Sequence, residues 1–419
     1  MSCDNPNVTI DAVKRSEAGD HSIIVHLHEL GNTHANTRLQ LGFPVEKCAL
    51  CTLMEEETAP AATDGKSVSL SFHPFEIKDP APVAGVGYGG STMKTSYRIG
   101  VDIGGTKVNA GILRPDGSIL KKCLLSSGGA GNPRAFVDEI CSSLRAMLDE
   151  LNIPLSLVEH IGVGIPGTAD SARGVVEYSC NLFGRNVPLG DYFEHALGRR
   201  VVVVQDSWAG AFAEHLFGAG RGHDDMMCVT IGTGIGCGVV LGGRVFGGAM
   251  HTAGELGHTP IIWQGRPCSC GRRGCLEAYT SGNAIWSQAI ERFPEKLRGL
   301  PQRAETIFDL VYAGDADARR LVEECVDKLA YGIALGMNLL AVDTVIISGG
   351  VSVHHDLIID PLKEKILGYG YPAWTETRTI QIMPAELGAD APMVGAAFLT
   401  PDQVDIPDEE RTVPHAAVY

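Results

Sequence analysis

The chain has 419 residues, of which 44% are hydrophobic and 20% charged, so we expect a folded protein with two or three domains. A formal net charge of -16 argues against nucleic acid and anionic membrane surfaces as partners. No apolar run reaches bilayer length and the N-terminus lacks a signal-peptide pattern, while the twelve cysteines have no regular spacing outside one loop. These features fit a reducing compartment, and we expect a cytoplasmic protein.

Residues 1–83 carry the alternating pattern of half-buried strands. Ile23, Val25 and Leu27 face one side of a strand, and His26 and His28 face the other. Residues 37–41 and 67–72 alternate in the same way, which predicts a small all-β segment. Residues 84–94 are rich in glycine, the composition of a flexible linker.

Two strand–turn–strand units follow, and each opens one half of the remaining chain. The first runs from a strand at 97–103 through Gly104, Gly105, Thr106 and Lys107 into a second strand. The second runs from 228–231 through the glycine-rich residues 232–236, which include Thr233 and Gly234. Glycines let backbone N–H groups approach an anion, so the repeat predicts a duplicated α/β domain that holds phosphate between its halves. The chain has no Gly-x-x-x-x-Gly-Lys-Ser/Thr loop, which excludes a P-loop enzyme.

Residues 162–167 match the dinucleotide-binding fingerprint Gly-x-Gly-x-x-Gly letter by letter. Pro166 lies where the helix would have to start, and no acidic residue follows at the expected distance. We therefore interpret this stretch as a substrate-facing turn after a buried strand, ending at Gly167.

A second buried strand, residues 201–204, ends at Gln205 and Asp206, and a helix follows. An aspartate at the carboxyl end of a buried strand lies where α/β sheets place their ligands. The alternative is a plain helix N-cap, and the local sequence does not separate the two.

Three thiols and one imidazole lie within eighteen residues, and the tight Cys-x-Cys pair has glycines beside it. A Cys₃His set of this density predicts a closed tetrahedral Zn²⁺ site, which holds a loop in place. Glu255 and Glu277 flank the set, so we interpret the loop as a substrate clamp. The alternative is a few buried cysteines beside one core histidine. The predicted ligands are His258, Cys268, Cys270 and Cys275.

Helices are predicted near 282–293, 303–312 and 315–340. A buried strand at 344–347 leads into Gly349 and Gly350, and the next helix is expected to begin near His354. Residues 391–399 form a helix of small side chains in this prediction. Residues 401–419 are polar and rich in proline, which predicts a disordered tail.

Residues 95–400 resemble the ROK family (repressors, open reading frames and sugar kinases) of the actin/hexokinase superfamily. The motifs that carry the resemblance are Asp102-Ile103-Gly104-Gly105-Thr106-Lys107, Gly164-Ile165-Pro166-Gly167, Asn181-Leu182, Asp206, Thr230-Ile231-Gly232-Thr233-Gly234, Gly254-Glu255-Leu256-Gly257-His258, the cysteine loop and Ser348-Gly349-Gly350. Residues 1–83 resemble the C-terminal β domain of α-mannosidases through Asn5-Pro6-Asn7-Val8, Val13-Lys14, Leu41-Gly42-Phe43 and Phe72-His73-Pro74-Phe75-Glu76-Ile77. We expect this segment to be a fusion remnant without glycosidase activity.

The resemblance implies an α/β fold with two actin/hexokinase-like (ribonuclease H-like) lobes, 95–210 and 211–400, around a cleft for ATP and a hexose. It implies an ATP-dependent sugar kinase, often a homodimer, in which Asp206 is the general base for a sugar hydroxyl, usually O6. The implied cofactors are Mg²⁺ with ATP and a structural Zn²⁺. The implied sugar contacts are Gly167, Asn181, Gln205, Asp206, Glu255, His258 and Glu277. The implied ATP and phosphate contacts are Asp102, Gly104, Gly105, Thr106, Lys107, Thr233, Gly234, Gly349 and Gly350.

The sugar itself stays open at this point. Glucose is the family's commonest substrate, and the mannosidase-like segment favours mannose next, with fructose, allose and N-acetylmannosamine as further alternatives. The family usually has Asn before the catalytic aspartate where this chain has Gln205, which puts the substrate in doubt but not the reaction type. Two rival functions are a ROK transcriptional repressor, which would carry an N-terminal helix-turn-helix, and a sugar-binding protein without catalysis.

Overall fold

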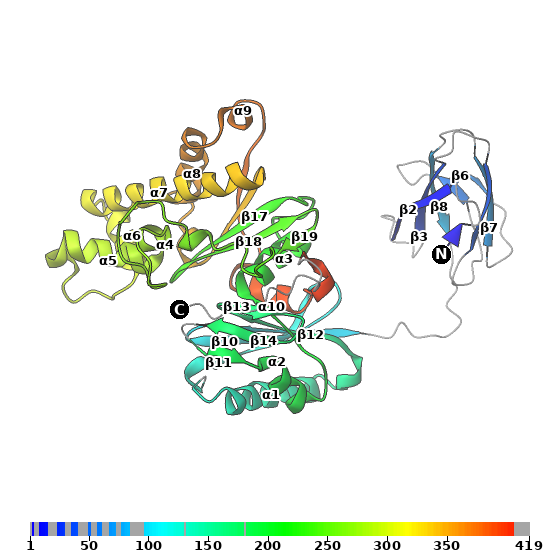
Figure 1. The fold of residues 1–419 in the computed structure, drawn as a ribbon, viewed down its shortest axis with the longest axis horizontal. Helices are drawn as coiled ribbons and strands as arrows, with labels where there is room; N and C mark the ends of the chain where they lie inside the picture. Colours follow the sequence, from blue (N-terminus) through cyan, green and yellow to red (C-terminus); the bar gives the residue numbers. More distant parts are fainter. Residues whose placement is uncertain are drawn as a thin grey trace. The chain divides into compact units, whose positions relative to one another are not determined.

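The computed structural model divides the chain into two compact units, Met1–Thr95 and Ser96–Tyr419. It describes residues 96–129, 131–179 and 182–405, together with the strands of the first unit (Figure 1). Side chains in the first unit are described only for Leu39, Gln40 and Ser67. The predicted linker, residues 84–94, lies outside the described residues. Among the described residues, no helix is both long and apolar enough to cross a membrane.

The first unit is built from strands, as its alternating pattern predicts. Its described strands pair antiparallel in the orders β1-β4-β7, β2-β3-β8 and β5-β6. The strands are β1 (Ser2–Cys3), β2 (Val8–Arg15), β3 (Ile23–Glu29), β4 (Ala35–Gln40), β5 (Ala49–Cys51), β6 (Glu57–Pro60), β7 (Ser67–Phe72) and β8 (Ile77–Val83).

The first lobe of the second unit contains a mixed sheet whose described strands have the order β11-β10-β9-β12-β16. The first three strands form an antiparallel meander, whereas β12 runs parallel to both β9 and β16. A small antiparallel sheet, β13-β14-β15, lies beyond β12 in the chain. The elements are β9 (Tyr97–Ile103), β10 (Lys107–Leu113), β11 (Ile119–Ser126), α1 (Pro133–Glu150), β12 (Val158–Ile165), β13 (Thr168–Asp170), β14 (Val175–Ser179), β15 (Gly184–Val187), α2 (Leu189–Leu197) and β16 (Val202–Gln205).

Helix α1 forms where its capping residues and apolar spacing predict it. The side chain of Asn132 accepts a hydrogen bond from the backbone N–H of Ala135, and Pro133 occupies the first helical position. Its apolar stripe is buried against β10 and β11. The fingerprint-like residues 162–167 lie largely inside β12, and β13 follows them rather than a helix, so the rejection of a dinucleotide site agrees with the local structure.

The second lobe contains a sheet whose described strands have the order β21-β20-β17-β18-β19-β22. Strands β17, β20 and β21 run parallel, and β17, β18 and β19 form a second antiparallel meander. The elements are β17 (Met226–Ile231), β18 (Ile235–Leu241), β19 (Arg244–Phe246), α4 (Glu277–Thr280), α5 (Gly282–Arg292), α6 (Ala304–Tyr312), α7 (Ala316–Leu340), β20 (Thr344–Ser348), α8 (Ile359–Lys365), α9 (Pro372–Thr375), β21 (Gln381–Pro384) and β22 (Val404–Asp405).

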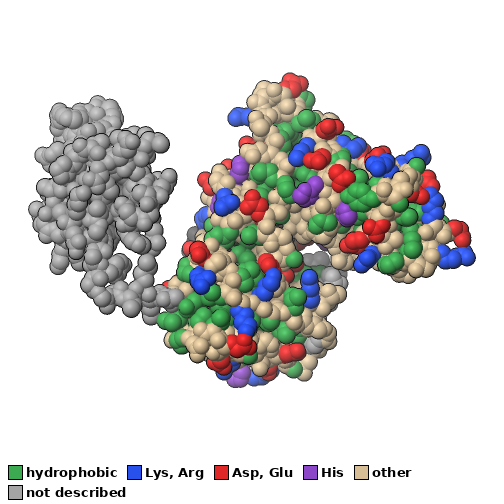
Figure 2. Space-filling view, turned by 180° about the vertical axis from the view of Figure 1, so that it is seen from behind, with side chains coloured by type: hydrophobic (Ala, Val, Ile, Leu, Met, Phe, Trp, Pro, Cys, Tyr) green, Lys and Arg blue, Asp and Glu red, His purple; other side chains and the backbone are tan. Residues whose placement is uncertain are grey.

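Helices α3 (Asp206–Phe217) and α10 (Ala391–Ala396) lie between the two sheets (Figure 1). Glycines allow this close packing. A Cβ atom on Gly162 would lie 1.8 Å from the carbonyl oxygen of Ala396, and one on Gly395 would lie 1.7 Å from that of Ala209. The backbones of β12, α10 and α3 therefore touch, and these two helices connect the lobes. Figure 2 shows a notch in the surface between the lobes, and acidic and basic side chains interspersed on this face.

Three expectations near the C-terminus are wrong. The helix expected near His354 begins at Ile359, because a 3₁₀ turn (Gly350–Val353) comes first. The helix predicted over 391–399 ends at Ala396. The predicted disordered tail is ordered over residues 401–405, since β22 pairs in parallel with β19 and Arg244 donates a hydrogen bond to the carbonyl of Asp402. Residues 406–419 lie outside the described residues.

Candidate active site

Asp102 and Asp206 lie at the carboxyl ends of strands that share one sheet. Asp102 pairs in register with Gly164 of β12, and Ile165 of β12 pairs with Gln205 at the end of β16. Asp206 is the first residue of α3, and its Oδ1 accepts a hydrogen bond from the backbone N–H of Ser207 at 2.7 Å. The parallel arrangement of β9, β12 and β16 therefore brings both aspartates to the ligand-binding edge of the sheet.

The surroundings of the two carboxyl groups raise the pKa of each, so each keeps its proton to a higher pH than an ordinary aspartate does. Burial raises the pKa of Asp102 to about 7, with a further rise from the charge of Asp206 and an opposing effect of Lys107. Burial raises the pKa of Asp206 to about 6, against the lowering effect of the Ser207 N–H, and the charge of Glu255 adds to the rise. A carboxylate with a pKa near 6 can take up a proton during a reaction near neutral pH.

The turn between β9 and β10 faces solvent. The backbone N–H of Gly104 donates to the carbonyl of Lys107 at 2.9 Å, and Ser127 Oγ donates to the carbonyl of Gly104 at 2.6 Å. Gly105, Thr106 and Lys107 are exposed, and a Cβ atom on Gly105 would meet no heavy atom within 4 Å. Hydrogen bonds fix the backbone of this turn while its last three residues stay open to solvent, an arrangement that suits an anionic ligand.

A cavity of about 380 Å³ lies at the carboxyl ends of β17 and β20. Gly232 and Thr233 of the second glycine-rich turn line it, together with Gly350. Gly349 does not face the cavity, since a Cβ atom there would lie 2.3 Å from the carbonyl oxygen of Ile231. Gly234 likewise packs on a side chain, that of Glu277. Of the expected phosphate contacts in this lobe, Thr233 and Gly350 line the cavity, whereas Gly234 and Gly349 pack against neighbouring protein atoms.

The same cavity contains residues that the sequence reasoning missed. They lie at or just before the amino ends of α5 and α6. Helix-start signals such as the capping Ser281 locate these ends, but not the turn that they meet. The missed residues are Asn283, Gln302, Arg303 and Glu305.

Gln205 and Glu255 meet across the candidate sugar side of the site. Gln205 Nε2 donates to Glu255 Oε1 at 3.2 Å, and Trp208 Nε1 donates to the carbonyl of Ala253 in the same loop at 2.9 Å. Gly167 has φ +119°, and a Cβ atom there would lie 2.2 Å from the carbonyl oxygen of Tyr178, so this position requires glycine. Asn181 lies outside the described residues.

The four predicted metal ligands come together. Their ligand atoms all lie within 4.8 Å of one another. Ideal Zn–S and Zn–N bonds in a tetrahedron separate two sulfurs by about 3.8 Å and a sulfur from a nitrogen by about 3.5 Å. The sulfurs of Cys270 and Cys275 are 3.8 Å apart, and Cys268 Sγ lies 3.5 Å from His258 Nδ1. The donor set therefore fits one Zn²⁺ ion.

Glu277, which the sequence predicts only as a sugar contact, accepts hydrogen bonds from two other parts of the protein. Its Oε2 accepts from the backbone N–H of Ile235 at 3.0 Å, and its Oε1 accepts from Ser269 Oγ at 2.8 Å. Oε1 also lies 3.8 Å from Cys268 Sγ. A carboxylate oxygen has two acceptor positions, so Oε2 keeps one for a further donor.

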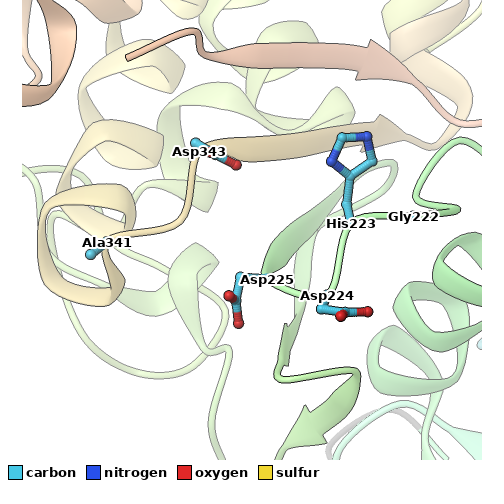
Figure 3. Close-up of a pocket in the computed structure, with 6 residues that line it drawn as sticks. All are labelled: Gly222, His223, Asp224, Asp225, Ala341 and Asp343. Atoms are coloured by element: carbon cyan, nitrogen blue, oxygen red, sulfur yellow. The ribbon is translucent and has the colours of Figure 1, made fainter. Parts of the chain in front are cut away.

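A second cavity, of about 240 Å³, lies at the opposite end of the same parallel strands (Figure 3). Asp224, Asp225 and Asp343 line it together with His223. Asp225 Oδ1 accepts from the backbone N–H of Gly242 at 2.8 Å. An acidic lining at the amino ends of the strands repels phosphate, so this cavity does not suit a nucleotide.

Two parts of the chain match known protein families. Residues 98–403 match the ROK family, and residues 7–78 match the C-terminal β-sandwich domain of glycosyl hydrolases family 38. The chain is 34% identical over 316 residues to a glucokinase of Thermotoga maritima, covering 73% of this chain and 98% of the relative. It is 24% identical over 310 residues to the xylose repressor of Bacillus subtilis, covering 74% of this chain and 78% of the relative.

A solved structure extends the likeness to the fold. The ROK family glucokinase of Streptomyces griseus, in complex with glucose and AMPPNP, superposes with a TM-score of 0.62 at 32% identity, covering 72% of this chain and 98% of that one. The predicted two-lobed α/β fold with a small all-β segment before it is thereby confirmed. Because the family match spans residues 98–403, this chain belongs to the ROK family.

Proposed function

We propose that this protein is an ATP-dependent hexose kinase, with glucose as its first substrate and mannose as the next, phosphorylated at a hydroxyl that is usually O6. The proposal depends mainly on the position and pKa of Asp206. This carboxyl group lies at the end of a strand, and its pKa is raised to about 6, in part by the charge of Glu255. Gln205, which precedes it, hydrogen-bonds to Glu255. The glucokinase relatives support the same activity.

In the proposed reaction, Asp206 accepts the proton of the sugar hydroxyl as that oxygen attacks the γ-phosphorus of ATP. The bond from the γ-phosphorus to the bridging oxygen of the β-phosphate breaks, and ADP leaves. Phosphoryl transfer asks the protein mainly for positioning and charge neutralisation, plus one group that orients the nucleophile. A positioned general base contributes roughly 10²–10⁴ in rate. The hydrogen bond from the Ser207 N–H holds the Asp206 carboxylate in one orientation.

The nucleotide is proposed to lie between the two glycine-rich turns, with its adenosine in the cavity that Gly350 lines and its phosphates near Thr233 and Gly234. On the first lobe, Gly104, Gly105, Thr106 and Lys107 face the phosphates in this proposal. Mg²⁺ bound with ATP would neutralise phosphate charge, and Asp102 is the carboxylate proposed to hold it.

On the sugar side, Gln205 and Glu255 are proposed to bind hydroxyl groups of the hexose. A planar amide and a carboxylate joined by one hydrogen bond offer both donors and acceptors to a sugar. The remaining proposed sugar contacts are Gly167, Asn181, His258 and Glu277.

The cysteine loop is proposed to hold a structural Zn²⁺ ion through His258, Cys268, Cys270 and Cys275. Support comes from the match between the 3.8 Å and 3.5 Å spacings and tetrahedral zinc geometry. A closed four-ligand site leaves no open coordination position, so the ion's proposed role is to hold the loop.

The deciding experiment measures ADP release with Mg-ATP across glucose, mannose, fructose, allose and N-acetylmannosamine. The control is Asp206→Asn, which keeps the shape of the side chain but removes its basicity. Sugar-dependent release that the variant loses supports the kinase and identifies its sugar. No release with any sugar, alongside saturable sugar binding, overturns the kinase in favour of a regulatory or binding role such as the repressor relatives suggest. Light scattering tests the homodimer that the family resemblance implies.

A further inference from the structure

Glu277 connects two parts of the second lobe that are distant in sequence. It is the first residue of α4 and follows the metal-cluster residue Cys275 by two positions. Its Oε2 accepts a hydrogen bond from the backbone N–H of Ile235, the residue at which the second glycine-rich turn ends and β18 begins. One oxygen of the carboxylate thus fixes the turn that contains Thr233 and Gly234.

The other oxygen of Glu277 fixes the cysteine loop. Its Oε1 accepts from Ser269 Oγ at 2.8 Å, and Ser269 stands between Cys268 and Cys270 of the metal cluster. Cys268 Sγ lies 3.8 Å from the same oxygen. A single carboxylate therefore bridges the metal loop and the glycine-rich turn, with one hydrogen bond on each side.

The space around this bridge leaves the turn little freedom. A Cβ atom on Gly234 would lie 2.4 Å from Glu277 Oε2, and a Cβ atom on Gly257, next to His258, would lie 2.3 Å from the carbonyl oxygen of Ile235. The backbone N–H of Gly282 donates to the carbonyl of Gly232 at 2.8 Å. Ile235 is only 7% exposed, so water does not readily replace the bond to its N–H.

From these contacts we propose that Glu277 is a positioning residue that sets the shape of the glycine-rich turn according to the state of the cysteine loop. Closure of the loop places Ser269, Ser269 orients the carboxylate, and the carboxylate holds the Ile235 N–H. This inference rests on the proposed function, because the turn is taken to bind the phosphates of ATP. It assigns the cysteine loop a role in nucleotide binding in addition to its role on the sugar side.

The test uses the full-length protein and two measurements on the same variants. Hydrogen exchange is followed in a peptide that contains Ile235, and binding of Mg-AMPPNP is compared with binding of adenosine, which lacks phosphates. The variants are Ser269→Ala, which removes the hydroxyl, Ser269→Thr, which restores it, and Glu277→Ala, which removes both acceptors. Ser142→Ala, at an exposed position of α1 in the first lobe, is the matched control, and bound metal is quantified in every variant.

Loss of one hydrogen bond to a charged group changes an equilibrium constant by about tenfold. The Ile235 N–H is therefore expected to exchange about tenfold faster in Ser269→Ala and Glu277→Ala. Both variants are expected to bind Mg-AMPPNP about three- to tenfold more weakly. Adenosine binding and metal content are expected to stay unchanged, and Ser269→Thr and Ser142→Ala should behave like the wild type. Wild-type exchange at Ile235 in Glu277→Ala, or equal weakening of adenosine and AMPPNP, overturns the inference. If the wild-type protein phosphorylates no sugar while Ile235 exchange still responds to Ser269→Ala, the proposed function fails and the bridge stands.

Discussion

Gln205 Nε2 donates a hydrogen bond to Glu255 Oε1 over 3.2 Å, which joins the end of β16 to the loop before His258. Gln205 precedes Asp206 directly, and the charge of Glu255 contributes to the raised pKa of Asp206. The amide thus links the candidate base to an acidic side chain from the other lobe.

Gln205→Asn shortens the side chain by one methylene and withdraws its amide from Glu255. We expect the KM for the preferred hexose to rise about three- to tenfold, with a smaller change in kcat, since one hydrogen bond is worth about 0.5–1.5 kcal/mol. Steady-state kinetics across the same set of sugars measures the effect. Unchanged KM values for every sugar would show that Gln205 does not contribute to sugar selection.

Asp206→Asn is expected to leave sugar binding nearly intact while it lowers kcat by at least about a hundredfold, the lower end of the general-base range. The amide keeps the volume of the carboxylate, and its oxygen can still accept the N–H of Ser207. Calorimetric sugar binding and coupled ADP release separate the two effects. A loss of only about twofold would reassign Asp206 as a helix cap.

The pH dependence of the reaction follows from the raised pKa of Asp206, about 6. A general base acts only when deprotonated, so kcat/KM for the sugar should rise with pH and level off above an apparent pKa of about 6. Glu255→Gln removes a neighbouring charge and should move this pKa downward. A profile that is flat between pH 5 and 8 would contradict the assignment of the base, at whatever absolute rate.

Removal of one cysteine tests the metal loop. Cys270→Ala leaves three ligands, so we expect bound zinc to fall from about one ion per chain to well below that value, and sugar binding to be lost as the loop opens. Metal analysis by mass spectrometry and sugar titration measure the two effects. Cys123→Ala is the matched control, because Cys123 lies on β11 away from the cluster. Full activity in zinc-free protein would contradict a structural role.

The glycine pair after β20 offers a matched test of backbone constraint. Gly349 has φ +92°, and its Cβ position lies 2.3 Å from the carbonyl oxygen of Ile231, whereas a Cβ on Gly350 meets nothing within 4 Å. Gly349→Ala should therefore lower the free energy of unfolding by about 1–3 kcal/mol, and Gly350→Ala by much less. Chemical denaturation measures both. Equal stabilities would mean that the chain relaxes around Gly349 without cost.

The local sequence was enough to predict helices, strands and the clustering of the cysteines. Asn132 and Pro133 mark the start of α1, and the valines of β16 mark a strand buried on both faces, because caps and periodicity act within a few residues. The clustering of one histidine and three cysteines could be predicted because these residues lie within eighteen positions of one another, and a short loop can bring their side chains together. The sites of the two glycine-rich turns were predicted by their repetition.

Only the tertiary structure determined which residues distant in sequence contact one another in the candidate site. Burial and the charge of Asp206 set the pKa of Asp102, and both depend on β12 lying between their strands. The bond from Glu277 to Ile235 joins residues 42 positions apart. The cavity joins the start of α6 to Gly350, and β22 reaches back to β19. Caps, turns and short ligand loops are short-range and could be predicted from the sequence, whereas contacts across the lobes arise only when sheets and helices pack, since no local pattern specifies which distant surface a side chain will meet.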